Sequence, residues 1–391
     1  MEIKMSFLQQ KSKIIDWLKK NLFGSWISGI VTCLFAIITI FIAKAVLKFI
    51  FVTAKWDVIP ANLKILMVGQ YTASEVWRVW LSLSVVVFLL GVLWGIKRGI
   101  IKAVSFSIIA IFAITLLLPF VSIATRVWAF TQILLTLAGF WIGHKFKFIK
   151  KYYFLGWLLS VPIILILLNG VGNMKDVNTN LWGGFLLTVL IAVVDIVLSF
   201  PIGVLLALGR RSKLVVIRWF CIIYIEVIRG VPLITVLFGA QLLLPLFLGN
   251  GLELNNVLRV MIGFTLFNAA YVAETVRGGM QIIPQGQYEA AQALGLNYVQ
   301  RITFVIMPQA LRSVVPALVG SVIEVFKDTS LVAIVSLMDL LGIAKRVVAN
   351  PQFLGRQMEV FLFVAAVFFV ICTVISKISK RMEVSSSYGK V

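Results

Sequence analysis

The residues of this chain that could do chemistry are polar and ionisable side chains inside long apolar stretches. They fall in two groups: Asn268, Tyr271 and Glu274 in one stretch, and the run from Glu324 to Ser330 in another. An ionisable group is costly inside a membrane, so such groups mark candidate binding sites or ion pairs. Asn268 and Tyr271 are one helical step apart and therefore share a helix face. These groups are the candidate lining of a path for a polar solute.

Enzyme chemistry is not expected in this chain. His144 is the single histidine, and it lies among lysines, where a solvated interfacial residue is expected. The sequence has no Gly-x-x-x-x-Gly-Lys-Ser/Thr loop, so it cannot cradle ATP itself. No His, Cys, Asp and Glu residues have metal-ligand spacing, and the three cysteines form no pairing pattern. We therefore predict no metal and no cofactor held by the chain.

The composition indicates which elements position these residues. The chain has 391 residues, of which 61% are hydrophobic and 13% charged, whereas soluble domains have about half and a quarter. The net charge of +21 would suggest nucleic-acid binding in a soluble protein. Here the Lys and Arg residues cluster between apolar runs, which favours a membrane protein over a nucleic-acid partner.

Continuous apolar runs of about twenty residues predict membrane-spanning helices and disfavour a β-barrel. The expected fold is an all-α integral membrane protein with about ten transmembrane helices. The expected spans are residues 27–49, 80–96, 101–121, 127–142, 153–168, 182–208, 219–248, 257–276, 314–341 and 360–378. The first run is long for a signal peptide and is expected to be retained.

Lys and Arg residues indicate the orientation, because they are enriched in cytoplasmic loops. They cluster at the N-terminus, near 97–102, 145–151 and 210–218, between 277 and 312, and in the tail, whereas residues 249–256 have none. Both termini and the loop that contains Glu289 are therefore expected in the cytoplasm. Two basic segments are exceptions on the outer side. They contain Lys55, Lys64 and Arg78, and Lys345, Arg346 and Arg356.

The spans fall in two parts separated by a polar hinge at residues 169–176. We expect an N-terminal extension of about five spans over 1–175, a core of five spans over 176–383, and a cytoplasmic tail over 384–391. No internal repeat supports an inverted-repeat transporter. In the extension, Gly91 and Gly95, and Gly139 and Gly143, have the spacing of helix-packing faces. Chance spacing among 28 glycines is an equal alternative.

A polar segment lies between the apolar runs expected at 257–276 and 314–341. Residues 289–294 are good helix formers, and Gly295 suits a C-terminal cap. A second short helix is expected from Tyr298 to Met307, stopped by Pro308. Alanines at 290, 291 and 293 leave a flat surface for another protein. A well-folded connecting loop without a partner is the alternative, because such helix signals are common.

The spacing within this segment resembles the conserved loop of bacterial ABC importer permeases. The matching residues are Glu289-Ala290-Ala291, Gly295, Val305 and Met307-Pro308, with conservative departures at Val305 and Met307. In that family the loop is a coupling helix that fits a groove on the ATP-hydrolysing subunit. The resemblance implies that Glu289, Ala290, Ala291 and Gly295 couple this chain to an ATPase.

Three further segments are similar to the polar amino acid permease subfamily: residues 224–233, 270–287 and 327–331. With the loop, they occur in the family's order and cover roughly 183–383. Most permeases of that subfamily are little more than the five-span core. A chain with extra leading spans is similar to the larger, M-type permease of general L-amino-acid importers, and Leu340-Leu341-Gly342 fits that branch.

The resemblance implies a type I ABC importer core that works by alternating access. Its expected partners are an ATP-binding-cassette dimer that carries ATP and Mg, a second permease or second copy, and a periplasmic amino-acid-binding protein. An amino acid brings an ammonium and a carboxylate into the membrane. Glu324 is expected to meet the ammonium, and Thr329 and Ser330 the carboxylate. The substrate-path candidates are Asn268, Tyr271, Glu324, Lys327, Asp328, Thr329 and Ser330.

Structural roles stay open for several charged residues. Lys327 and Asp328 fit an ion pair that holds a helix bend. Glu274 and Arg277 are expected near the cytoplasmic edge, in a gate or the coupling region. Glu226 and Arg229 are expected to pair locally on one helix, and the resemblance gives Asp195 no role; it is expected to pair with a neighbouring helix.

Two other functional classes remain as alternatives. An ion-coupled secondary amino acid transporter would use Glu324, Asp328 and Asp195 as a proton relay. A membrane scaffold or receptor would carry nothing. Deleting the loop that contains Glu289 distinguishes an ATP-driven importer from these alternatives. The deletion abolishes uptake only if an ATPase drives transport. The sequence does not indicate which amino acid is carried, since the binding protein sets most of that choice.

Overall fold

A computed structural model describes residues 19–97, 99–119, 121–146, 148–170, 174–248 and 254–387. These residues form helices joined by short loops, with two isolated bridges and no β-strand among them. The all-α fold class is confirmed. The chain divides into two compact units, residues 1–57 and 58–391, which we describe separately.

The first unit is one long helix in its described part. Helix α2 (Trp26–Lys48) continues into a π-helical turn, Phe49–Thr53. Ser25 begins it with a capping box, in which its side chain accepts from the Ser28 amide. Apolar side chains lie on every side of α2, the pattern of a membrane span. The expected span at 27–49 is therefore confirmed as part of a 28-residue candidate span.

The second unit begins with the helices of the extension. These are α3 (Val58–Val68), α4 (Val76–Ile96), α5 (Ile100–Leu117), α6 (Ile123–Lys145) and α7 (Ile149–Asn169). Helices α4 and α6 cross closely at their glycines. A Cβ on Gly91, Gly95, Gly139 or Gly143 would lie within 3.0 Å of the facing helix backbone. The helix-packing interpretation of these glycines is therefore confirmed.

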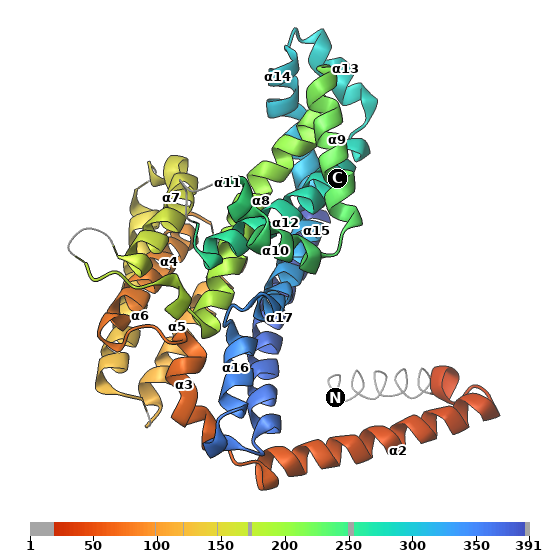
Figure 1. Ribbon diagram of the computed structural model, residues 1–391. Helices are drawn as coiled ribbons and strands as arrows, with labels where there is room; N and C mark the ends of the chain where they lie inside the picture. Colours follow the sequence, from red (N-terminus) through yellow and green to blue (C-terminus); the bar gives the residue numbers. More distant parts are fainter. Residues whose placement is uncertain are drawn as a thin grey trace. The chain divides into compact units, whose positions relative to one another are not determined.

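Apart from the short helices of the polar segment, the helices that follow α7 form the core that Figure 1 shows in green and blue. They are α8 (Gly184–Arg210), α9 (Val215–Gly230), α10 (Leu233–Leu242), α11 (Leu244–Leu248), α12 (Asn256–Ile282), α15 (Met307–Asp328), α16 (Leu340–Val348) and α17 (Gln357–Ser387). Helix α12 packs against α8 and α15. Helix α7 joins the same core, since its Ile164 and Leu168 belong to one cluster of buried residues with Leu187 and Ile191 of α8.

The helices can be compared with the expected spans one by one. Among the described residues, seven helices are long and apolar enough to cross a membrane, or eight if one bent pair counts as a span. The two further expected spans, 101–121 and 153–168, coincide with the apolar helices α5 and α7. Each expected span therefore has an apolar helix or a bent helix pair at its place.

The bent pair corrects the expected span at 219–248. Helix α9 ends at Gly230, α10 begins at Leu233, and the two meet at 109°. Pro232 lies between them; it lacks an amide donor and disfavours helical geometry at the residue before it. A second expected span, 314–341, also breaks. A 3-10 segment, Thr329–Val335, follows α15, and Ser336 then adopts a left-handed conformation with φ 67°.

The polar segment forms α13 (Gln285–Ala293), α14 (Tyr298–Gln300) and a π-helical segment, Arg301–Ile306. Gly295 ends the first helix at φ 74°. Its amide donates to the Gln292 carbonyl at 2.9 Å, and the Leu296 amide donates to the Ala291 carbonyl at 3.2 Å. This is a Schellman cap, so the predicted role of Gly295 in ending the helix is confirmed.

The predicted stop at Pro308 was wrong. The helical segments that begin at Tyr298 run without a break into α15, which starts at Met307. Pro308 lies directly after the π-helical segment, where the α-helical hydrogen-bonding pattern begins. It removes one amide donor at this change of helix type, and the helix continues past it.

Candidate functional site

A cavity of about 810 Å³ opens beside the long core helices. The sequence candidates Asn268 and Tyr271 of α12 line it, as do Glu324, Lys327 and Asp328 of α15. These five residues come from two separate apolar stretches, and the packing of α12 on α15 brings them to one space. The cavity therefore collects most of the predicted substrate-path residues.

The other walls of the cavity are mostly apolar. Helix α8 contributes Phe200 and Pro201, α10 contributes Leu233, and α7 contributes Trp157. A concave apolar site with a few polar groups is typical of small-molecule binding. The wall from α7 shows that the N-terminal extension, and not the core alone, shapes this site.

Two sequence candidates lie elsewhere. Thr329 is fully buried, and its hydroxyl donates to the Phe326 carbonyl at 2.7 Å. Neither Thr329 nor Ser330 is among the residues that line the cavity. Both belong to the 3-10 segment that follows α15. Their position supports a role in the helix break and gives them no direct contact with a solute in this cavity.

Asn268 also makes a contact behind the cavity wall. Its amide nitrogen donates to Oδ2 of Asp195 on α8 at 2.6 Å. Asp195 is fully buried. The expectation that Asp195 pairs with a neighbouring helix is therefore confirmed, and the partner is a residue of the candidate site.

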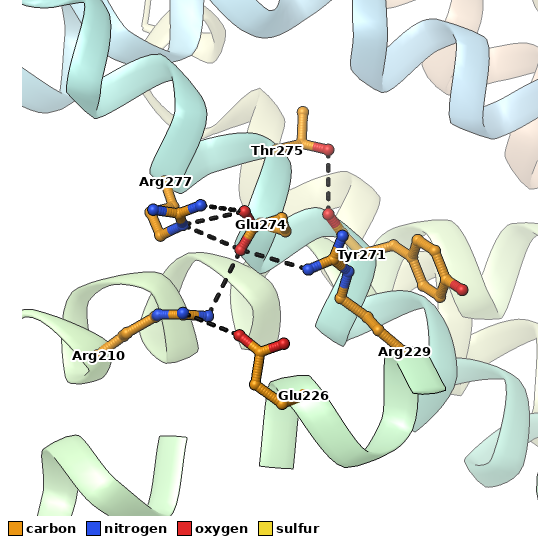
Figure 2. A network of polar contacts seen from close by, with 7 residues as sticks. All are labelled: Arg210, Glu226, Arg229, Tyr271, Glu274, Thr275 and Arg277. Atoms are coloured by element: carbon orange, nitrogen blue, oxygen red, sulfur yellow. Dashed lines mark hydrogen bonds and ion pairs between the residues drawn. The ribbon is translucent and has the colours of Figure 1, made fainter. Parts of the chain in front are cut away.

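A network of charged side chains joins α8, α9 and α12, and Figure 2 shows it from close by. Glu274 accepts from Arg277 Nε at 2.9 Å and 3.0 Å. Its carboxylate also lies 3.5 Å from Arg210 and 3.6 Å from Arg229. Arg210 reaches Glu226 at 2.9 Å. Three guanidinium groups and two carboxylates thus hold three helices together.

The network corrects one prediction from the sequence. Glu226 and Arg229, three residues apart on α9, were expected to pair locally. Instead Glu226 pairs with Arg210 of α8, and Arg229 pairs with Glu274 of α12. Sequence reasoning gave Arg210 no role, although it bridges both acids. Its place at the end of an apolar run was the only signal, and orientation explained that equally well.

The network is also connected to the cavity. The guanidinium of Arg229 lies over the Tyr271 ring, 5.8 Å from its centroid, and Tyr271 lines the cavity. Thr275 donates to the Tyr271 carbonyl at 3.0 Å, one turn along α12. A cation over an aromatic face is a favourable contact. Movement of α9 relative to α12 would therefore disturb both the network and a wall of the cavity.

The predicted coupling residues lie on α13 and its cap. Glu289, Ala290 and Gly295 are exposed, whereas Ala291 is buried. Tyr288 connects this helix to the end of α8, because its hydroxyl accepts from Arg211, the residue after α8, at 3.0 Å. The exposed small residues leave room for a partner surface, while the buried face anchors the helix to the core.

Comparison with known proteins identifies the family. Residues 199–383 match the family described as binding-protein-dependent transport system inner membrane component. The inner membrane amino-acid ABC transporter permease protein YhdY of Escherichia coli K12 is 34% identical over 398 residues, which cover 97% of this chain and 95% of that protein. This chain belongs to that permease family. It is thus an inner membrane transport protein and not an enzyme, which supports the permease prediction over the ion-coupled alternative.

Two other similarities cover the permease core. The glutamate/glutamine/aspartate/asparagine transport system permease protein BztC of Rhodobacter capsulatus is 47% identical over 211 residues, which cover 54% of this chain and 49% of that protein. A crystal structure of an amino acid ABC transporter with histidines is 29% identical, covers 50% of this chain and 89% of its own chain, and has a TM-score of 0.45.

Proposed function

We propose that this permease forms the translocation path of an ATP-driven importer for polar L-amino acids. The cavity carries the proposal, because it places two acids and a lysine beside one another inside the core. An amino acid needs partners for both an ammonium and a carboxylate when it leaves water. The names of the relatives, which include amino-acid, glutamate, glutamine and aspartate permeases, support the same substrate class.

Within the cavity, Glu324 and Asp328 are the proposed partners of the ammonium group. Lys327 is the proposed partner of the carboxylate, in place of Thr329 and Ser330, which lie outside the lining. Asn268 and Tyr271 add neutral polar atoms on the facing helix. One cation and two acids among the described lining residues favour a solute that carries both signs of charge.

Energy is proposed to enter through α13. Glu289, Ala290, Ala291 and Gly295 would dock in a groove on an ATP-binding-cassette subunit, which carries ATP and Mg. ATP binding would favour the outward-facing state of the permease through its preferential affinity for that state. The hydrogen bond between Tyr288 and Arg211 supports this coupling, since it links α13 to the end of α8.

The remaining partners follow from the same scheme. A periplasmic binding protein would deliver the amino acid to the outer face, and a second, related permease would complete a heterodimer. This chain would be the larger, M-type subunit, with both termini in the cytoplasm. Its likeness to YhdY over nearly the whole length supports a permease that includes the leading helices.

The test is a double variant of the α13 surface, Glu289→Lys with Gly295→Asp, in the assembled transporter in proteoliposomes. We expect ATP-dependent amino acid uptake to fall at least tenfold, because the charge reversal opposes docking and a side chain at φ 74° distorts the cap. Lys213→Glu is the matched control, since it reverses an exposed charge outside α13. Intact uptake in the double variant would refute the coupling role.

A further inference from the structure

Asp195 is a buried carboxylate that the proposed transport cycle does not use. It lies on α8, is fully buried, and accepts from the Asn268 amide nitrogen at 2.6 Å through Oδ2. Its Oδ1 atom has no hydrogen-bond partner among the described residues. One oxygen of this carboxylate is thus satisfied by Asn268, and the other is not satisfied by a described side chain.

Packing does not explain an acid at this position. The neighbours of Asp195 on α8 include Ile191, Ala192 and Val194, all buried and apolar. A buried carboxylate with an unsatisfied oxygen costs stability, whereas an apolar residue of similar size would not. An acid at this position therefore needs a compensating role. The residue that hydrogen-bonds to Asp195 among the described residues, Asn268, lines the cavity.

The contact fixes which way the Asn268 amide faces. An amide has one donor end and one acceptor end of nearly equal size. In this structure the nitrogen end of Asn268 faces Asp195, because Nδ2 donates to Oδ2 of the carboxylate. The amide oxygen, on the other side of the same carbon, is then the atom left for the cavity. Without Asp195, either end could face the cavity.

We propose that Asp195 is a positioning residue that makes Asn268 a hydrogen-bond acceptor for the ammonium group of the solute. This inference rests on the proposed function, since it assigns a role within the same cavity. The Asn268 oxygen on α12 would be a third acceptor, beside the carboxylates of Glu324 and Asp328 on α15. An ammonium has three donors, so acceptors on both helices can hold it between α12 and α15.

The test compares Asp195→Asn with the wild type in the assembled transporter, with L-glutamine and L-glutamate as probes. Asparagine at 195 can accept or donate, so the Asn268 amide is no longer fixed. We expect KM for uptake to rise about tenfold, the effect of one lost charged hydrogen bond. The control Thr265→Val removes a buried hydroxyl without a hydrogen-bond partner on α12 and should leave KM unchanged.

Two further variants separate positioning from packing. In an Asn268→Ala background, Asp195→Asn should raise KM no further, because Asp195 acts through Asn268. The exchange Asp195→Asn with Asn268→Asp should restore KM, since a carboxylate at 268 accepts in either orientation. Any of three results would overturn the inference. KM could stay unchanged in Asp195→Asn, Asp195→Asn could raise KM further in the Asn268→Ala background, or the exchanged pair could fail to restore KM. If the wild-type transporter shows no ATP-dependent amino acid uptake, the proposed function is refuted instead.

Discussion

At the residue scale, Glu274 is the centre of the charged network in Figure 2. It faces Arg277 of its own helix, Arg210 of α8 and Arg229 of α9. Its side chain is 23% exposed, so water screens these contacts only in part. A carboxylate that contacts three guanidinium groups contributes more than an isolated surface ion pair. Its loss removes the acid that Arg277 and Arg229 contact and leaves Arg210 with Glu226 alone.

We expect Glu274→Gln to lower the free energy of unfolding by about 1–3 kcal/mol, since the amide keeps the shape but loses the charge. The measurement is the thermal unfolding of the detergent-purified protein. Glu289→Gln is the control, because Glu289 is exposed, and it should not change the unfolding temperature. Equal unfolding temperatures for Glu274→Gln and the wild type would show that the network does not stabilise the fold.

At the element scale, capping residues determine where the core helices begin and end. Asp339 caps α16, and its carboxylate accepts from the Gly342 amide at 2.8 Å and from the Leu341 amide at 3.2 Å. The cap is fully buried. Burial raises the pKa of Asp339 from its ordinary value of 3.8 to about 6, although the two amide hydrogen bonds act in the opposite direction.

This raised pKa predicts a pH dependence of stability. The folded protein holds the Asp339 proton more tightly than the unfolded chain, so the contribution of Asp339 is fully present below pH 3.8. It is lost as pH rises through about 6 and amounts to roughly 3 kcal/mol at 1.36 kcal/mol per pH unit. Asp339→Asn should remove this part of the slope between pH 4 and 7 and keep the helix cap.

The measurement is the unfolding temperature of the wild type and Asp339→Asn at each pH, since the difference between them isolates this residue from other titrating groups. Asp176→Asn alters an exposed aspartate and should follow the wild-type profile. If wild type and Asp339→Asn keep a constant separation across the range, the ionisation of Asp339 is not linked to folding.

Local patterns predicted these elements with unequal success. Gly295 and the glycines of α4 and α6 were foreseen because a cap or a close crossing needs a residue without a side chain. Pro232 and Pro308 show that a proline alone does not predict a helix end. Pro232 lies at a sharp break, whereas Pro308 lies at the start of α15 in a helix that continues. The effect of a proline depends on whether its missing amide would otherwise donate a hydrogen bond.

At the scale of the whole molecule, the second unit has short helices at both ends of its long core helices. In Figure 1, α13 and α14 lie at one end of the long core helices, and α16 lies at the other. The cavity lies along α8, α12 and α15, and the charged network lies towards the α13 end of α12. The proposed solute path and the proposed docking helix α13 thus lie at different positions along the same helices.

This arrangement predicts opposite accessibility for two exposed positions, Glu289 and Lys345. In a background with Cys33, Cys221 and Cys372 replaced by alanine, Lys345→Cys should react with a membrane-impermeant maleimide in intact spheroplasts. Glu289→Cys should react only after permeabilisation. The reverse result would invert the orientation inferred from the Lys and Arg distribution. The unaltered background protein, without cysteine, is the control for nonspecific labelling.

The sequence by itself determined the class of the protein, most of its spans, and the loop with Glu289 and Gly295. These features are local, because run length, helix signals and caps depend on residues within a few turns of one another. It also identified the polar residues inside the membrane, since their cost makes each one conspicuous.

Only the tertiary structure decided which of these residues meet. Asp195 and Asn268, which form a hydrogen bond, are 73 positions apart. Glu226 forms an ion pair with Arg210 and not with Arg229, three residues along the same helix. Such pairs depend on how each helix is rotated and shifted against the next, and side-chain packing over the whole core sets that register. The cavity is a product of the same packing, so no local pattern could have separated its lining residues from Thr329 and Ser330.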